Sequence, residues 1–134
     1  MSVELPQRAR EILAAPNFAT VSTMRGDNTI HAVVVWVDVD ESGRVLLNSA
    51  EGRTWPQNIA RDPRLTITVP NLENPYEFVS ITGRVVETDH DDAPAHIDAL
   101  AMKYLGQDKY PFLQPGEVRV KFTVVPERVH VQAG

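Results

Sequence analysis

The chain gathers polar and charged side chains around one short turn, between an apolar segment and a predicted helix. The candidates for chemistry there carry amide, hydroxyl or guanidinium groups: Asn48, Ser49, Arg53, Thr54 and Asn58. Thr54 can cap the helix, and Pro56 suits its first turn because the missing N–H is no loss there. Free N–H groups at a helix start, beside the Arg53 guanidinium, favour binding of a phosphate group. The same pattern also occurs at helix starts that bind nothing.

Patterns for catalysis by side chains alone do not occur in the sequence. His90 and His96 are six residues apart, which does not match the one-turn spacing of a helical zinc pair. The sequence contains no Gly-x-Ser-x-Gly elbow, Walker loop or dinucleotide fingerprint. It also contains no cysteine, which excludes disulfides, thiolate metal sites and cysteine nucleophiles. We therefore assign no catalytic residue and expect no metal site.

Length and composition indicate one ordinary globular domain. The 134 residues predict a single domain over 1–134, and 43% hydrophobic with 23% charged residues is typical of a soluble protein. No apolar run approaches the roughly 20 residues that cross a bilayer, and no signal-peptide pattern occurs. We therefore expect a cytoplasmic protein without membrane contact. The net charge of −5, with no basic run, argues against a nucleic-acid partner.

Hydrophobic periodicity predicts six strands with short helices between them and at the front. The strands are expected at 18–24, 30–39, 44–49, 65–69, 76–88 and 118–131, and the helices near 6–15, 54–62 and 92–105. Successive strands joined by tight turns favour a mainly β, six-stranded antiparallel barrel. The run of β-branched residues within 30–39 suggests burial on both faces, as in a barrel wall or a dimer core. Gly83 marks a bulge or a close-packing point.

Ten segments, in order along nearly the whole chain, carry a family resemblance. They are FATVST (18–23), LNSAEGR (47–53), NIARDPR (58–64), NPY (74–76), ITGRV (81–85), AHID (95–98), KYLG (103–106), YPF (110–112), PGEVR (115–119) and PERV (126–129). With them the chain resembles the pyridoxamine 5′-phosphate oxidase-like flavoproteins, and most of all their actinobacterial branch that uses the deazaflavin coenzyme F420. The resemblance implies a homodimer of six-stranded split barrels, of the FMN-binding split-barrel type, with two cofactor sites at the subunit interface.

The resemblance also implies which residues approach the cofactor. The strand from Ala32 to Val37 would lie along the ring, Arg53 and Thr54 would contact the phosphate, and Tyr76 and Phe78 would often come from the other subunit. The full set implied is Ala32, Val33, Val34, Val35, Trp36, Val37, Asn48, Ser49, Arg53, Thr54, Trp55, Asn58, Tyr76 and Phe78. Trp55 stands where the family usually has a phosphate-pairing lysine. A ligand contact, ring stacking, closure of the pocket and packing at a dimer interface are the alternatives for its side chain.

The function implied by the resemblance is an F420-dependent oxidoreductase. It would transfer a hydride from the reduced deazaflavin to a small planar acceptor, such as an enone, a quinone or a tetrapyrrole. The ring would carry the chemistry, which fits the lack of a catalytic pair in the sequence. The alternatives are an FMN-dependent oxidoreductase of the same fold, and a non-catalytic protein that binds flavin, deazaflavin or haem.

Overall fold

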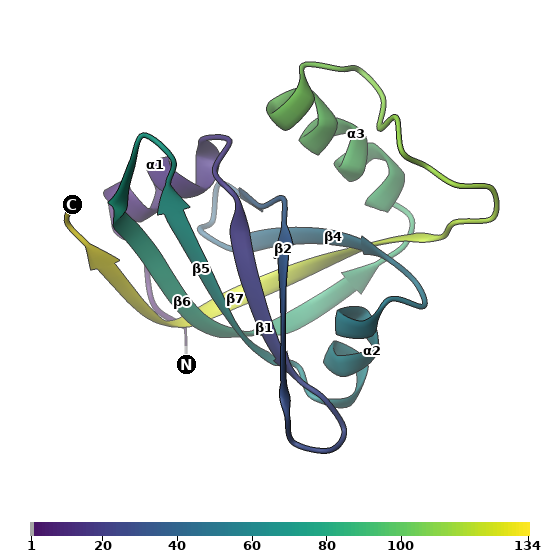
Figure 1. The fold of residues 1–134 in the computed structure, drawn as a ribbon, viewed down its shortest axis with the longest axis horizontal. Coiled ribbons are helices and arrows are strands. Elements are labelled where there is room, and N and C mark those ends of the chain that lie inside the picture. The colour runs from purple at the N-terminus through teal and green to yellow at the C-terminus, as the bar shows by residue number, and fades with distance from the viewer. Residues whose placement is uncertain (1) are drawn as a thin grey trace.

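Seven strands form one curled antiparallel sheet in the computed structural model, which describes residues 2–134 (Figure 1). The strands are β1 (Ala19–Met24), β2 (Ile30–Val35), β3 (Asp38–Val39), β4 (Val45–Ala50), β5 (Arg64–Asn71), β6 (Asn74–Asp89) and β7 (Arg119–Gln132). The helices are α1 (Gln7–Ala14), α2 (Thr54–Arg61) and α3 (Ala93–Leu105). The order in the sheet is β2-β1-β5-β6-β7-β4-β3. This arrangement confirms the predicted mainly β split-barrel class.

The valine-rich segment 30–39 forms two strands where the sequence predicts one. β2 pairs with β1, whereas β3 pairs with β4 at the opposite edge of the sheet. Between them Val37 bonds to α3: its N–H donates to the Tyr104 hydroxyl (3.1 Å), and its carbonyl accepts from Lys103 Nζ (2.6 Å). Because only two residues separate the edge strands, the strand ends lie within about 11 Å of each other. The described sheet therefore has seven strands, not six. The two-residue corner formed by Trp36 and Val37 keeps its two edge strands close together.

The inner face of the sheet and the helices α1 and α2 enclose the hydrophobic core. α1 contributes Ala9, Ile12 and Leu13, and α2 contributes Trp55 and Ile59. Their spacing of three or four residues places these side chains on one face of each helix. None of the helices in residues 2–134 is both long and apolar enough to cross a bilayer.

Strand β2 is half-buried on one face and exposed on the other. Val33 and Val35 pack against the core, whereas Ile30 and Val34 are 66% and 65% exposed. The expected burial on both faces of this strand is therefore not met within a single chain.

The long ribbon of β6 and β7 changes register at Gly83, as the sequence predicts. The pairing shifts between Thr82 and Gly83. A Cβ atom at this position would clash with the carbonyl oxygen of Val125 on the neighbouring strand. The close approach of the two backbones therefore requires glycine.

Candidate functional site

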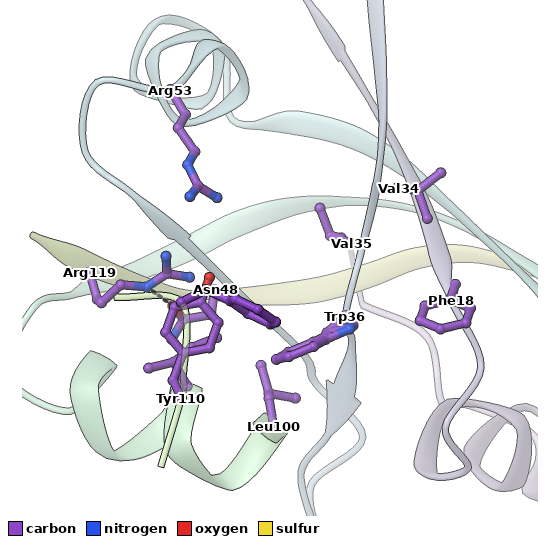
Figure 2. A pocket seen from close by; sticks show the side chains of 11 residues that line it. Phe18, Val34, Val35, Trp36, Asn48, Arg53, Leu100, Tyr110 and Arg119 are labelled. Atoms are coloured by element: carbon purple, nitrogen blue, oxygen red, sulfur yellow. Dashed lines mark hydrogen bonds between the residues drawn. The ribbon is translucent and has the colours of Figure 1, made fainter. Parts of the chain in front are cut away.

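A cavity of about 330 Å³ lies between β2, α3 and the turn that leads into α2 (Figure 2). Most of its walls are apolar or aromatic, with two arginines and one amide: Phe18, Val34, Val35, Trp36, Asn48, Arg53, Ile97, Leu100, Tyr110, Phe112 and Arg119. This volume and the few converging polar groups are typical of a small-ligand site. The structure thus brings together five residues from the set that the resemblance implies: Val34, Val35, Trp36, Asn48 and Arg53.

Two arginines from different elements form a cationic end of the cavity. Arg53 is the N-cap residue of α2, and its side chain is 52% exposed. Arg119 begins β7, which pairs with β4 and places Arg119 opposite Ala50. The carboxylate of Glu117 lies between the two guanidinium groups, 3.6 Å from Arg53 Nη2 and 3.3 Å from Arg119 Nη1. Two cations and one anion leave this end with one net positive charge.

Three contacts hold the amide of Asn48 in one orientation. Its Oδ1 accepts from Arg119 Nε at 3.0 Å, and its Nδ2 donates to the carbonyl oxygen of Ala93 at 3.1 Å. Nδ2 also lies 3.0 Å from His96 Nδ1, so this ring nitrogen must be the acceptor and the proton must lie on Nε2. Burial lowers the pKa of His96 to about 4, which keeps the imidazole neutral near pH 7. Asn48 therefore directs its oxygen toward Arg119.

Stacked aromatic rings support the Trp36 side of the cavity. Trp36 lies parallel to Tyr104, with centroids 5.1 Å apart and an interplanar angle of 5°, and Tyr110 meets Trp36 edge-on at 6.0 Å. The Tyr104 hydroxyl donates to the carbonyl of Asn17 at 2.5 Å and accepts from the Val37 N–H. Burial raises the pKa of Tyr104 to about 12, so the hydroxyl keeps its proton. Tyr104 thus fixes Trp36 from behind the wall of the cavity.

Trp55 lies in the hydrophobic core and not in the cavity. Its side chain is 3% exposed and packs against Phe122, with ring centroids 5.1 Å apart. Because the indole fills the space beneath α2, it does not stack in the cavity, close it or reach the surface, which corrects the prediction for this residue. The prediction that Thr54 caps α2 is also wrong. Thr54 is the first helical residue, and the N-cap residue Arg53 makes no side-chain capping bond.

The rest of the implied set lies outside the cavity lining. These residues are Ala32, Val33, Val37, Ser49, Thr54, Trp55, Asn58, Tyr76 and Phe78. Asn58 is buried and donates from Nδ2 to Thr23 Oγ1 at 3.0 Å, which anchors α2 to β1. Ser49 is 1% exposed, whereas Tyr76, on β6, is 81% exposed. That Tyr76 and Phe78 approach a cofactor from a partner subunit stays a prediction.

Six lining residues are missing from the implied set: Phe18, Ile97, Leu100, Tyr110, Phe112 and Arg119. Arg119 reaches Asn48 from 71 positions away because β7 pairs with β4. Periodicity within a segment does not reveal such a pairing. The signals that could have found Arg119 and two of the aromatic residues are the PGEVR and YPF segments, which match the family.

Comparisons with known proteins agree with this architecture. The family described as Pyridoxamine 5′-phosphate oxidase matches residues 5–132. No protein with a curated description matches the sequence. Among solved structures, an F420 reductase has a TM-score of 0.81 and 23% identity, over 94% of this chain and 98% of that one.

Two further solved structures resemble the chain. The protein Atu2129 of Agrobacterium tumefaciens str. C58, of unknown function, has a TM-score of 0.76 and 17% identity, over 100% of this chain and 60% of that one. The conserved hypothetical protein Rv2991 of Mycobacterium tuberculosis has a TM-score of 0.73 and 16% identity, over 98% and 86%. At these identities the likenesses show the fold.

Proposed function

Because the chain belongs to the pyridoxamine 5′-phosphate oxidase family, we propose that it is a reductase that uses the deazaflavin coenzyme F420. The family supports an oxidoreductase that works with a flavin or deazaflavin. The F420 reductase among the similar structures favours the deazaflavin. The proposed reaction is hydride transfer from reduced F420 to a planar unsaturated acceptor such as an enone, a quinone or a tetrapyrrole.

One observation supports this proposal most strongly: the cavity joins a cationic end to flat apolar walls. An anionic tail would be met by Arg53 and Arg119, and a planar ring by Trp36 and the adjoining valines. Among residues 2–134, those that line the cavity include no carboxylate, imidazole or thiol. A bound coenzyme would therefore supply the reacting group, and the protein would supply binding and orientation.

The chemistry of the lining fits such a coenzyme. Arg53 and Arg119 would hold its phosphate through charge-assisted hydrogen bonds. Val35 and Trp36, from the end of β2 and the corner after it, and Leu100, from α3, would position the ring and exclude water (Figure 2). The reduced form of F420, when bound, would supply a hydride from its ring and would be left oxidised.

We also propose that the active form is a homodimer. Ile30 and Val34, on the outer face of β2, are 66% and 65% exposed, and Val34 also lines the cavity. Exposed apolar side chains that adjoin a cavity are typical of a covered surface. Light scattering during gel filtration measures the mass, and a monomer at micromolar concentration would contradict the homodimer.

Titration of the protein with F420 and with FMN, followed by fluorescence, tests the proposal. We expect F420 to bind at micromolar concentration, and absence of such binding would reject the proposed function. Arg53→Ala should weaken F420 binding tenfold or more, because a charged hydrogen bond contributes about 1.5–3 kcal/mol. Unchanged affinity would remove Arg53 from the site.

FMN is the alternative cofactor that the family supports, and such a protein would purify yellow with bound flavin. A non-catalytic binding protein is distinguished by turnover. Oxidation of reduced F420 by a quinone, followed by absorbance, should occur with the protein present. Binding of F420 without turnover across a panel of quinones and enones would instead identify a carrier.

A further inference from the structure

We propose that Glu117 sets the charge of the anion that the cavity accepts, and so favours a phosphodiester over a phosphate monoester. This inference rests on the proposed function and concerns the same cavity. F420 carries its ring-proximal phosphate as a diester, whereas FMN carries a monoester. Glu117 would thus be a residue that determines which of the two cofactors binds.

Glu117 does not itself line the cavity, but its carboxylate lies between the two arginines of the cationic end. Its side chain is only 10% exposed, and its two carboxylate oxygens face different arginines, Arg53 and Arg119, at 3.6 and 3.3 Å. The backbone beside it is also held in place, since the carbonyl of Val118 accepts from the N–H of Glu51 at 2.9 Å. Glu51 belongs to the turn that carries Arg53. Glu117 is therefore held close to both segments that form the anion site, the turn that carries Arg53 and the start of β7 that carries Arg119.

The side chain of Arg119, the second cation, is held in place beside Glu117. Arg119 has a side chain that is 4% exposed, its Nε donates to Asn48 Oδ1 at 3.0 Å, and its guanidinium lies over the ring of Tyr110 at 5.0 Å. Arg53 is the more exposed of the two, at 52%. An entering phosphate therefore meets two guanidinium groups whose combined charge is already lowered by one carboxylate.

The charge of the ligand decides how much that carboxylate matters. A phosphodiester carries one negative charge, whereas a monoester carries about −1.5 to −2 near pH 7. Attraction to the site grows in proportion to the ligand charge, but the cost of desolvating an anion grows with its square. With one net positive charge at the site, a monoester gains little over a diester. Without Glu117 the attraction would rise, and the monoester would gain most.

A structural role for Glu117 gives a different pattern. If the carboxylate only kept the segment before β7 in place, its loss would change the binding of all ligands by the same factor. A set of ligands that share one ring and differ only in charge separates the two roles. Riboflavin, the methyl phosphodiester of FMN and FMN itself form such a set, with no charge, one charge and nearly two charges.

The experiment measures dissociation constants of these three flavins, and of F420, by fluorescence. The proteins are the unmodified chain, Glu117→Gln and the control Glu41→Gln, which removes an exposed carboxylate from the turn between β3 and β4. We expect Glu117→Gln to tighten FMN about tenfold more than the methyl diester, since two charges several ångströms apart near a protein surface interact on that scale. Riboflavin affinity should not change, and Glu41→Gln should resemble the unmodified chain.

The outcomes separate this inference from the proposed function. F420 binding with an unchanged ratio of FMN to diester affinity in Glu117→Gln overturns the role of Glu117 alone. Absence of binding of F420 and of every flavin rejects the proposed function, and this inference with it. The unmodified chain provides a test that needs no folded variant, because it should bind FMN no more tightly than the diester. Clearly tighter binding of FMN there would also overturn the inference.

Discussion

Protonation of His96 should destabilise the folded protein, by an amount that follows from its burial. The ring is 7% exposed, and its Nδ1 accepts a hydrogen bond from Asn48. Burial lowers the pKa of His96 from 6.5 to about 4. Between these values the unfolded chain binds a proton that the folded chain does not, so stability falls as the pH falls. The gap corresponds to about 3 kcal/mol, of which about 2 kcal/mol is lost between pH 8 and pH 5.

Urea denaturation of the unmodified protein and of His96→Gln, at pH values from 5 to 8, measures this contribution. The variant should lack about 2 kcal/mol of the pH dependence, while the other histidines affect both proteins equally. The carboxyls of Asp62 and Glu77, each with a pKa lowered to about 2 by an arginine partner, titrate below this range. Nitrogen NMR should find the proton on Nε2. A proton on Nδ1 would refute the assigned orientation of Asn48, and a His96 pKa near 6.5 would refute the effect assigned to its burial.

Substitutions at two further positions, Trp55 and Tyr104, test whether each side chain stabilises the fold or contacts the ligand. Trp55→Ala should lower the free energy of unfolding by about 3–5 kcal/mol, and Trp55→Phe by less, because the indole fills the core. Both variants should keep their F420 affinity when folded; its selective loss would return Trp55 to the site. Tyr104→Phe keeps the stack on Trp36 but leaves the Val37 N–H unpaired, so urea denaturation should show a loss of about 1–3 kcal/mol. Undiminished stability would show that water replaces the hydroxyl.

Local sequence predicts most of the strands and helices but not the break in the valine-rich segment. α2 ends at Arg61, just before Asp62-Pro63, because proline disfavours helical dihedrals in the residue before it. The break after Val35 has no comparable local cause, since β-branched residues continue beyond it. It depends on Lys103 and Tyr104, which lie 66 and 67 positions after Val37. Periodicity cannot place a contact of that range.

The candidate site divides in the same way. The polar turn and Arg53 form a local pattern, whereas Arg119 and Glu117 become part of the cationic end only through the pairing of β7 with β4. Trp55 is a different case, because a local signal was present. Trp55 and Ile59 are four residues apart and share the buried face of α2. This spacing predicts a core residue, whereas the polar neighbours of Trp55 and the lysine that the family usually has at this position favour a ligand contact.

The corner between β2 and β3 also helps to hold β1 and β2 in alignment. Sliding β2 by two residues would keep the same faces, and Val35 could take the place of Val33. Such a slip would move Trp36 off its ring partner and carry Val37 away from both of its bonds to α3. The turn at the other end of β2 opposes the same slip, because the N–H of Arg25 donates to the carbonyl of Thr29 at 2.8 Å and the N–H of Asn28 donates to the carbonyl of Arg25 at 3.0 Å. The alignment of β1 with β2 is therefore held at both ends of β2, by the hairpin turn at one end and by the corner and α3 at the other.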